Sequence, residues 1–199
     1  MQPLLDQQAI ELVTAPATTA ISLEEVRQQL RIEHSDDDLL LDRLINVAQA
    51  FTDVTGALGH AMINQTWAQW VAPYPSEVPL FLGPVRSVSS IKYYDTDGVL
   101  QTATLDNFDV FGTEFATTIK PKSGYAWPST QNRPDAIRIE YVIGYGSSAS
   151  DVPEGIRHAM MMLIGHWYEN RENAALDQLS DVPYGYDVII GLYRRAWYG

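Results

Sequence analysis

The feature that most constrains the fold of this chain is a change in hydrophobic period, from helical to alternating and back. Apolar residues recur at helical spacing over residues 22–56 and again over 153–171. Between them, residues 63–143 form short alternating runs separated by prolines and turn residues. A period of 3.6 marks an amphipathic helix, and a period of 2 marks a half-buried strand. The order predicts an α+β fold, in which N- and C-terminal helices form a helical core and a small antiparallel β domain is inserted between them.

The N-terminal helical segment carries its own start and stop signals. Ser22 and Glu25 form an S-x-x-E capping box. Three aspartates at 36–38 fill the first turn of a second helix, where negative charge opposes the helix dipole. Gly56 is placed to end that helix in a left-handed turn. We therefore expect a helix pair over 22–56. Capping explains the aspartates better than a metal site, because consecutive helical residues point about 100° apart.

The middle of the chain is typical of an antiparallel sheet. Residues 88–94 and 99–105 flank Asp95-Thr96-Asp97-Gly98, a favourable hairpin turn. A calcium loop beginning at Asp95 is disfavoured, because Val99 and Leu100 interrupt it and its twelfth residue is Asp106 instead of glutamate. Further candidate strands lie at 66–71, 78–82, 108–111, 115–120 and 136–142. This region predicts a small barrel or sandwich.

The helix over 153–171 is apolar on more than one side. Asp151 is its expected N-cap. One stripe follows helical spacing: Ile156, Ala159, Met160, Leu163, Ile164 and Trp167. Met161 and Met162 flank this stripe, so the helix is either buried on two sides within its own core or shared with another subunit. From the second alternative we expect Met161, Met162 and Trp167 at a subunit interface.

These patterns divide the chain into four parts. Residues 1–21 are expected to form an extended arm that orders against a partner, and residues 22–62 and 144–181 the helical core. Residues 63–143 form the inserted β domain, and residues 182–199 form a C-terminal docking tail.

The end of the chain combines aromatic and basic residues: Tyr193, Arg194, Arg195, Trp197 and Tyr198. Aromatic residues and arginine are the favoured anchor types at protein interfaces. This tail either docks into a partner or folds back on its own domain.

Composition narrows the function classes. The 199 residues include no cysteine, 13 basic and 25 acidic residues, and a formal net charge of −12. Disulfides, cysteine–zinc sites, iron–sulfur clusters and thiol nucleophiles are therefore excluded. The acidity argues against nucleic-acid binding as the main activity, because that affinity comes largely from Lys and Arg. Neither a targeting signal nor an apolar run of membrane-spanning length occurs, so we expect no membrane span and an intracellular site of synthesis.

No motif for catalysis, cofactor binding or metal binding is present. His158 and His166 are eight residues apart, whereas a zinc-binding helix spaces its histidines by four. We predict no enzyme, no cofactor and no metal. Two alternative functions remain at this point: a glycan-acting hydrolase using paired carboxylates such as Asp106 and Asp109, and a small-ligand-binding β module.

The order of segments resembles the head–tail connector, or adaptor, proteins of long-tailed phages and gene transfer agents. The resemblance spans residues 22–195, and no single motif carries it. It rests on Ser22-Leu23-Glu24-Glu25-Val26, Leu30-Arg31-Ile32, Asp36-Asp37-Asp38-Leu39-Leu40, Leu44-Ile45, Ala48, Thr55-Gly56, Gln65-Thr66-Trp67, Leu82-Gly83-Pro84-Val85-Arg86-Ser87-Val88, Ile91-Lys92-Tyr93-Tyr94-Asp95, Asp97-Gly98, Gly144-Tyr145-Gly146, Asp151-Val152-Pro153-Glu154-Gly155-Ile156-Arg157-His158-Ala159, His166-Trp167-Tyr168-Glu169-Asn170-Arg171 and Tyr193-Arg194-Arg195.

The resemblance implies a virion structural protein in the neck of a phage or gene transfer agent particle. Such adaptors form a dodecameric ring under the portal and offer the other face of the ring to a stopper or tail terminator. DNA passes through the lumen without sequence-specific binding. The resemblance implies portal docking by Tyr193, Arg194 and Arg195, and the aromatic character of the tail extends this expectation to Trp197 and Tyr198.

Overall fold

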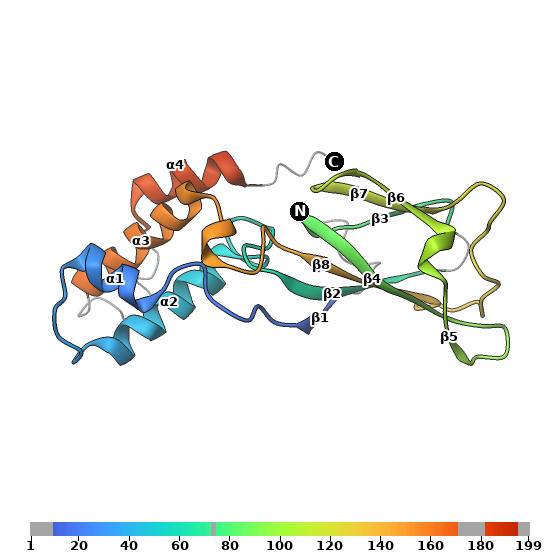
Figure 1. Cartoon of the computed structure of the whole chain (residues 1–199), viewed down its shortest axis with the longest axis horizontal. Coiled ribbons are helices and arrows are strands. Elements are labelled where there is room, and N and C mark those ends of the chain that lie inside the picture. Colours follow the sequence, from blue (N-terminus) through green and yellow to red (C-terminus); the bar gives the residue numbers. More distant parts are fainter. Residues whose placement is uncertain (1–9, 73–74, 171–181, 195–199) are drawn as a thin grey trace. The chain divides into compact units, whose positions relative to one another are not determined.

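The chain divides into two compact units (Figure 1). The structure, a computed structural model, describes residues 10–72, 75–170 and 182–194. The β unit contains residues 10–15 together with the described part of 64–144, and the helical unit contains residues 16–63 and the described part of 145–194. The backbone therefore passes from one unit to the other three times, after residues 15, 63 and 144. The mixture of helices and antiparallel sheets confirms the predicted α+β class.

The helical unit is built around one central helix. Its elements are α1 (Leu23–Leu30), α2 (Asp38–Thr52), the 3₁₀ turn η2 (Ala149–Asp151), α3 (Glu154–Glu169) and α4 (Tyr184–Tyr193). Within this unit α2 and α4 both pack against α3 (Figure 1), and the end of α2 also contacts α4 through Thr52 and Tyr186. The predicted apolar stripe of α3, from Ile156 to Trp167, is buried in full. Burial of this stripe against the other helices is the main source of cohesion in the unit.

The helix ends follow the sequence in part. The capping box of Ser22 and Glu25 is present at the start of α1, as predicted. The aspartates before α2 act differently from the prediction, because Asp37 accepts a hydrogen bond from Tyr168 Oη (2.6 Å) and its side chain does not cap the helix. Asp38 pairs with Arg27 on α1. Asp151 is not the N-cap of α3, which is Pro153; its carboxylate caps η2 by accepting the Ser148 backbone N–H (2.9 Å).

The β unit contains two antiparallel sheets. The five-stranded sheet has the order β1-β2-β8-β4-β5, and the three-stranded sheet has the order β3-β7-β6. The strands are β1 (Ile10–Thr14), β2 (Gln65–Val71), β3 (Val78–Pro79), β4 (Val85–Tyr94), β5 (Leu100–Thr102), β6 (Phe108–Thr113), β7 (Ala116–Pro121) and β8 (Ile137–Ile143), with the 3₁₀ turn η1 (Leu105–Asn107) before β6.

Strand β8 is central to the larger sheet and has the regular alternation of a half-buried strand. Ile137, Ile139, Tyr141 and Ile143 are fully buried, whereas the residues between them are half-buried. Gln69 on β2 ties this sheet to β3 and the residues that follow it, because its Nε2 donates to the Pro79 carbonyl (3.0 Å) and its Oε1 accepts from the Phe81 N–H (3.3 Å). The buried side-chain amide of Gln69 is thus hydrogen-bonded, as buried polar groups in proteins generally are.

The predicted hairpin turn between β4 and β5 is confirmed. Gly98 has a φ of 80°, a left-handed conformation that glycine adopts without strain. The Asp95 carboxylate accepts the backbone N–H groups of Asp97 (3.1 Å) and Val99 (2.9 Å). A hydrogen bond from the Gln101 side chain is the largest cause of the lowered pKa of Asp95, and these two backbone bonds lower that pKa further. The Asp95 side chain therefore organises the turn, as aspartates do at this position.

The described ends of the chain fold onto the units to which they belong. Residues 10–14 form strand β1, which pairs antiparallel with β2 of the same chain, so this part of the arm is ordered without a partner. The reason is the outer edge of β2, which offers hydrogen-bond partners to any adjacent strand. At the other end, α4 packs against α3, so the described part of the tail folds back on its own unit.

Candidate functional site

The side chains predicted at the subunit interface lie mostly inside the helical unit. Trp167 is 7% exposed and makes an edge-to-face contact with Phe51, with ring centroids 6.0 Å apart. A Cβ added at Gly185 of α4 would lie 2.5 Å from Met162 Cε, so α4 closely covers Met162. Met161 is half-buried against the same core. Trp167 therefore packs in the core of the unit, where α2 and α4 cover it, and the subunit-interface role expected for Met161, Met162 and Trp167 stays a prediction.

The predicted docking residues Tyr193 and Arg194 anchor α4 to its own unit. A Cβ added at Gly155 would lie 2.6 Å from Tyr193 Oη, so the tyrosine packs tightly over the first turn of α3. Arg194 Nε donates to the Ala57 carbonyl (2.8 Å). The other three predicted docking residues, Arg195, Trp197 and Tyr198, lie outside the described residues.

A buried hydrogen bond fixes the rotation of α4 about its axis. Tyr186 is fully buried, and its hydroxyl lies 3.0 Å from Thr52 Oγ1 on α2. Burial raises the pKa of Tyr186, because the phenolate would lose its hydration. With Tyr186 and Ile190 turned inward, the opposite face of α4 must point to solvent.

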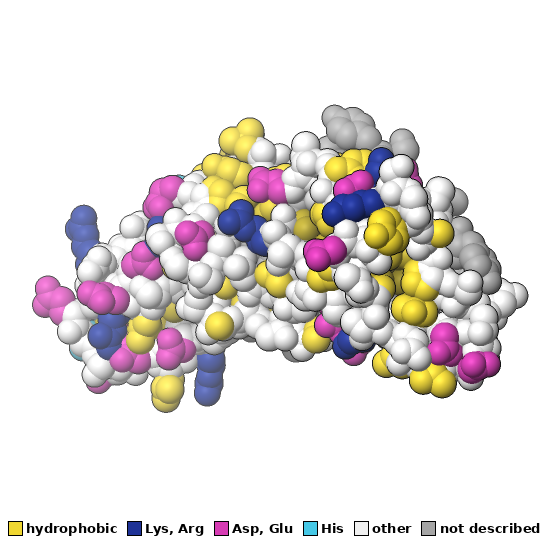
Figure 2. Space-filling model, turned by 45° about the vertical axis from the view of Figure 1, so that its right-hand side comes forward, with side chains coloured by type: hydrophobic (Ala, Val, Ile, Leu, Met, Phe, Trp, Pro, Cys, Tyr) yellow, Lys and Arg dark blue, Asp and Glu magenta, His cyan; other side chains and the backbone are white. Residues whose placement is uncertain are grey.

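That outward face of α4 is apolar, although it is exposed. Tyr184, Val188 and Leu192 recur every four residues and are 85%, 49% and 80% exposed. Hydrophobic side chains gather over the α4 side of the helical unit, at the top of the view in Figure 2. Contiguous exposed apolar side chains on one helix face mark an interaction surface.

A second exposed apolar strip lies on α2. Val47 and Phe51 are 45% and 38% exposed, and Ala50 between them is also exposed. Arg43, one helical turn before Val47, lies on the same outward side and is exposed. Phe51 reaches inward far enough to contact Trp167 and Tyr186, so this strip is backed by the core of the unit.

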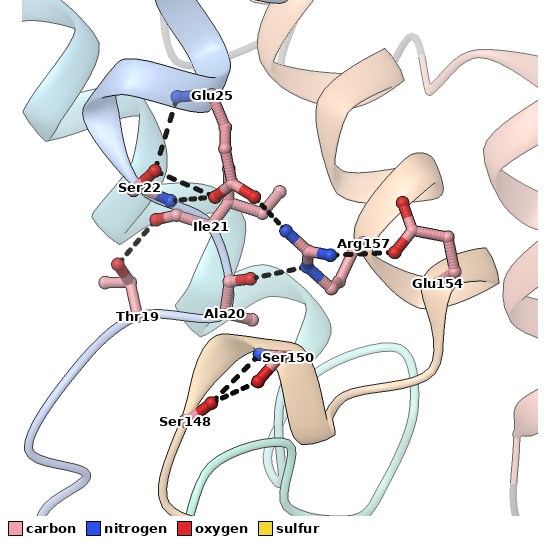
Figure 3. Close-up of polar contacts among 9 residues, drawn as sticks. All are labelled: Thr19, Ala20, Ile21, Ser22, Glu25, Ser148, Ser150, Glu154 and Arg157. Carbon is pink, nitrogen blue, oxygen red and sulfur yellow. Dashed lines mark hydrogen bonds and ion pairs between the residues drawn. The ribbon is translucent and has the colours of Figure 1, made fainter.

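One arginine joins three segments of the helical unit (Figure 3). Arg157 on α3 donates from Nε to the Ala20 carbonyl (3.1 Å) and from Nη1 to Glu154 (2.7 Å), and it forms an ion pair with Glu25 on α1. Its side chain is only 15% exposed. Burial of Glu25 opposes ionisation, but hydrogen bonds from Ser22 and the charge of Arg157 outweigh it and lower the pKa of Glu25. The cluster holds the chain in place where it leaves the β unit and begins α1.

The described residues contain no cluster of three or more His, Cys, Asp or Glu side chains that could hold a metal ion. The carboxylates named for the alternative hydrolase do not form a distinctive site, since Asp106 is exposed on η1 and Asp109 is half-buried on β6. No helix within the described ranges has the length and apolar character to cross a bilayer.

An α+β subunit whose helices present apolar faces to solvent belongs to the class of proteins that work by association. The family model for head completion proteins matches residues 19–196. The chain therefore belongs to the head completion protein family. This confirms the resemblance to head–tail connector proteins that the sequence indicated. Comparison with curated proteins gives no significant match.

Several solved structures share the fold over nearly the whole chain. A chain from the "neck of empty GTA particle computed with C6 symmetry" matches with a TM-score of 0.74 and 21% identity, covering 96% of this chain and 98% of that one. Chains from the "virion of native gene transfer agent (GTA) particle" and the "neck of native GTA particle computed with C12 symmetry" match with TM-scores of 0.66 and 0.67, identities of 22% and 21%, and the same coverage. At these identities the likeness establishes the fold.

Sequence reasoning missed the outward face of α4. The signal was present, since Tyr184, Val188 and Leu192 are spaced as one side of a helix. Two glycines, Gly185 and Gly191, lie within the same ten residues and weaken any helix prediction. The sequence therefore predicts a tail here.

Proposed function

We propose that this protein is the head–tail adaptor of a phage-like particle, a structural subunit that forms a ring in the neck, below the portal, and joins it to the tail. The observation that carries the proposal is the family match over residues 19–196. It is supported by the fold shared with chains from gene transfer agent necks. The alternative hydrolase has no comparable support, and the proposed role requires no catalysis.

A ring requires each subunit to bind its neighbours through two different faces. The neck structures that share this fold were computed with C6 and C12 symmetry, as expected for rings. The helical unit of this chain offers two exposed apolar strips, on α2 and on α4. These properties suit a subunit that is folded alone and assembles on a template.

Docking to the portal is assigned to the C-terminal segment, in which the first two residues named hold the segment on its own unit and the last three contact the portal. Tyr193 and Arg194 hold α4 on its own unit. Arg195, Trp197 and Tyr198 follow directly and carry the aromatic and cationic chemistry that anchors interfaces. These three residues contact the portal, and the opposite face of the ring receives the tail-side component, a stopper or tail terminator.

DNA passes through the lumen of the ring without being held. Each subunit contributes a formal net charge of −12. A negative lumen repels the phosphate backbone and lets the genome slide.

The test is to mix the purified protein with the portal from the same gene cluster and image the product by electron microscopy. We expect a ring stacked on one end of the portal. The triple variant Arg195→Ala, Trp197→Ala, Tyr198→Ala keeps Tyr193 and Arg194, so it should remain folded but lose portal binding. Tyr125→Ala, which removes an exposed aromatic from the β unit, is the matched control and should bind normally. Wild-type protein that leaves a folded portal bare would refute the proposal.

A further inference from the structure

Gly191 lies on the outward face of α4, where no described residue of its own chain requires a glycine. A Cβ added there would meet no heavy atom of the described residues within 4 Å, and the backbone of Gly191 is helical. Glycine inside a helix is less stable than alanine, because it loses more backbone freedom on folding. At Gly185 the case is the opposite, since a Cβ would meet Met162 Cε at 2.5 Å. Gly191 therefore leaves a flat place where the backbone of another molecule can approach α4 closely.

The flat place lies between apolar side chains and beside one charge. Gly191 lies beside the strip of Tyr184, Val188 and Leu192, and Asp187 lies on the same exposed side of the helix. An occupant of this surface must therefore be mainly apolar, with a positive group near Asp187.

The outward strip of α2 has that chemistry. It presents Val47, Ala50 and Phe51, with the exposed Arg43 one turn earlier. Within the described part of the chain, neither Arg43 nor Asp187 forms an ion pair. The small side chain of Ala50 also allows a helix to approach α2 closely.

The two strips cannot meet within one subunit, because α4 turns its buried face, with Tyr186, towards α2 and its own strip away from it. Two different, complementary faces on one subunit form a head-to-tail pair, and head-to-tail contacts close into rings when the rotation between subunits allows it. A symmetric two-fold dimer would instead place the same strip against itself and bring Asp187 towards Asp187.

We propose that in the assembled ring the outward face of α4 of one copy packs on the outward face of α2 of the next copy. Gly191 provides the close approach, and Asp187 pairs with Arg43 of the neighbour. This proposal rests on the proposed ring function and names its subunit contact, which differs from the Met161, Met162 and Trp167 surface expected from the sequence.

The experiment reverses each charge alone and then both together, in the full-length chain. Arg43→Asp and Asp187→Arg each place like charges across every subunit contact. We expect either single variant to reduce ring formation at least about tenfold, as close interfacial charge pairs do. The double variant restores opposite charges and should recover to within about threefold of wild type. Both side chains are exposed, and melting curves of all three variants verify that the subunit is folded.

A second variant tests the close approach without changing charge. Gly191→Leu fills the flat place with a bulky side chain, so it should leave the melting temperature at or above that of wild type and abolish rings. Glu169→Leu, at an exposed position near the end of α3, adds the same side chain elsewhere and should assemble normally. Rings are counted by electron microscopy with the portal and by mass photometry of the protein alone.

Each outcome separates this contact from the proposed function. Single variants that still form normal rings would overturn the contact. Single variants that stay defective without rescue in the double variant would also overturn it, and would indicate that α4 binds the portal instead. Wild-type rings that do not bind the portal would contradict the adaptor role and leave the contact standing. Wild-type protein that forms no ring under any condition would refute both.

Discussion

At the residue scale, Arg157 shows how one side chain can join several segments of a small helical unit. It binds Ala20, Glu25 and Glu154 at once, so it fixes the segment before α1 and the starts of two helices (Figure 3). A largely buried guanidinium holds such a position only when its donors are satisfied.

We predict that Arg157→Ala lowers the free energy of unfolding by about 2 kcal/mol, because Glu25 loses its partner and the Ala20 carbonyl loses a donor. Chemical denaturation monitored by circular dichroism measures the change. Arg86→Ala, at an exposed arginine of β4 outside the ion pairs of the described chain, is the control and should change stability by less than about 0.5 kcal/mol. Equal effects of the two variants would contradict the role given to Arg157.

Glu25 predicts a pH dependence with a defined sign. Its pKa in the folded protein lies below the ordinary value of 4.5. Its ionised form therefore contributes stability that is complete above about pH 4.5 and is lost as the pH falls through the lower folded value. The melting temperature of wild type should exceed that of Glu25→Gln at pH 7, and the difference should shrink towards pH 3. A difference that grows on acidification would contradict this.

Gly56 shows which residue-scale features could be predicted and which could not. The sequence predicts that Gly56 ends the second helix in a left-handed conformation, but α2 ends at Thr52 with Asp53 as its C-cap, and Gly56 does not have that conformation. Instead a Cβ at Gly56 would lie 2.0 Å from the Phe51 carbonyl oxygen. Local patterns identify caps such as that of Ser22, whereas a close approach depends on the path of the chain in space.

At the scale of elements, α4 is held by one buried face whose centre is Tyr186. We predict that Tyr186→Phe lowers the stability of the subunit by about 1 kcal/mol, because Thr52 loses its buried hydrogen-bond partner. Tyr184→Phe removes the same hydroxyl from the exposed face and should have no measurable effect. Thermal denaturation of both variants measures the contrast. Equal melting temperatures would show that the bond to Thr52 contributes nothing to stability.

Strand β1 protects the outer edge of the larger sheet. Deleting residues 2–15 removes β1 and leaves the backbone of β2 without its partner, so we expect concentration-dependent aggregation. Deleting residues 2–9 retains every residue of β1 and is the control. Light scattering at increasing protein concentration measures the effect, and equal behaviour of the two deletions would contradict it.

The two elements that sequence analysis missed share a physical cause. The stripe of α3 was predictable because its six apolar residues are all buried on one side. Strand β1 shows no such alternation, since four of its five residues are exposed, and only the edge of β2 makes it a strand. In α4, Gly185 has no side chain because a Cβ there would meet Met162 of α3, and this glycine lowers the helix propensity of the segment. Both elements are determined by partners distant in sequence.

At the scale of the whole molecule, net charge governs how the subunit meets DNA. A formal charge of −12 repels DNA phosphates at long range, and added salt weakens this repulsion by screening it. A basic protein behaves differently, because it binds DNA by releasing counterions from the phosphates. We predict no binding of duplex DNA by the subunit or the ring between about 50 and 200 mM salt. Fluorescence anisotropy of labelled DNA measures this. Binding that weakens steeply with added salt would show a basic surface and contradict the proposed passive lumen.

The three passages of the backbone between the units have a mechanical consequence. Two domains joined by a single linker are separated by one cut in that linker, whereas the two units of this chain are connected by the backbone after residues 15, 63 and 144. One proteolytic nick leaves two covalent connections intact. Any pull that separates the units is shared among three strands of peptide. In each subunit, three peptide connections instead of one would then resist separation of the two units.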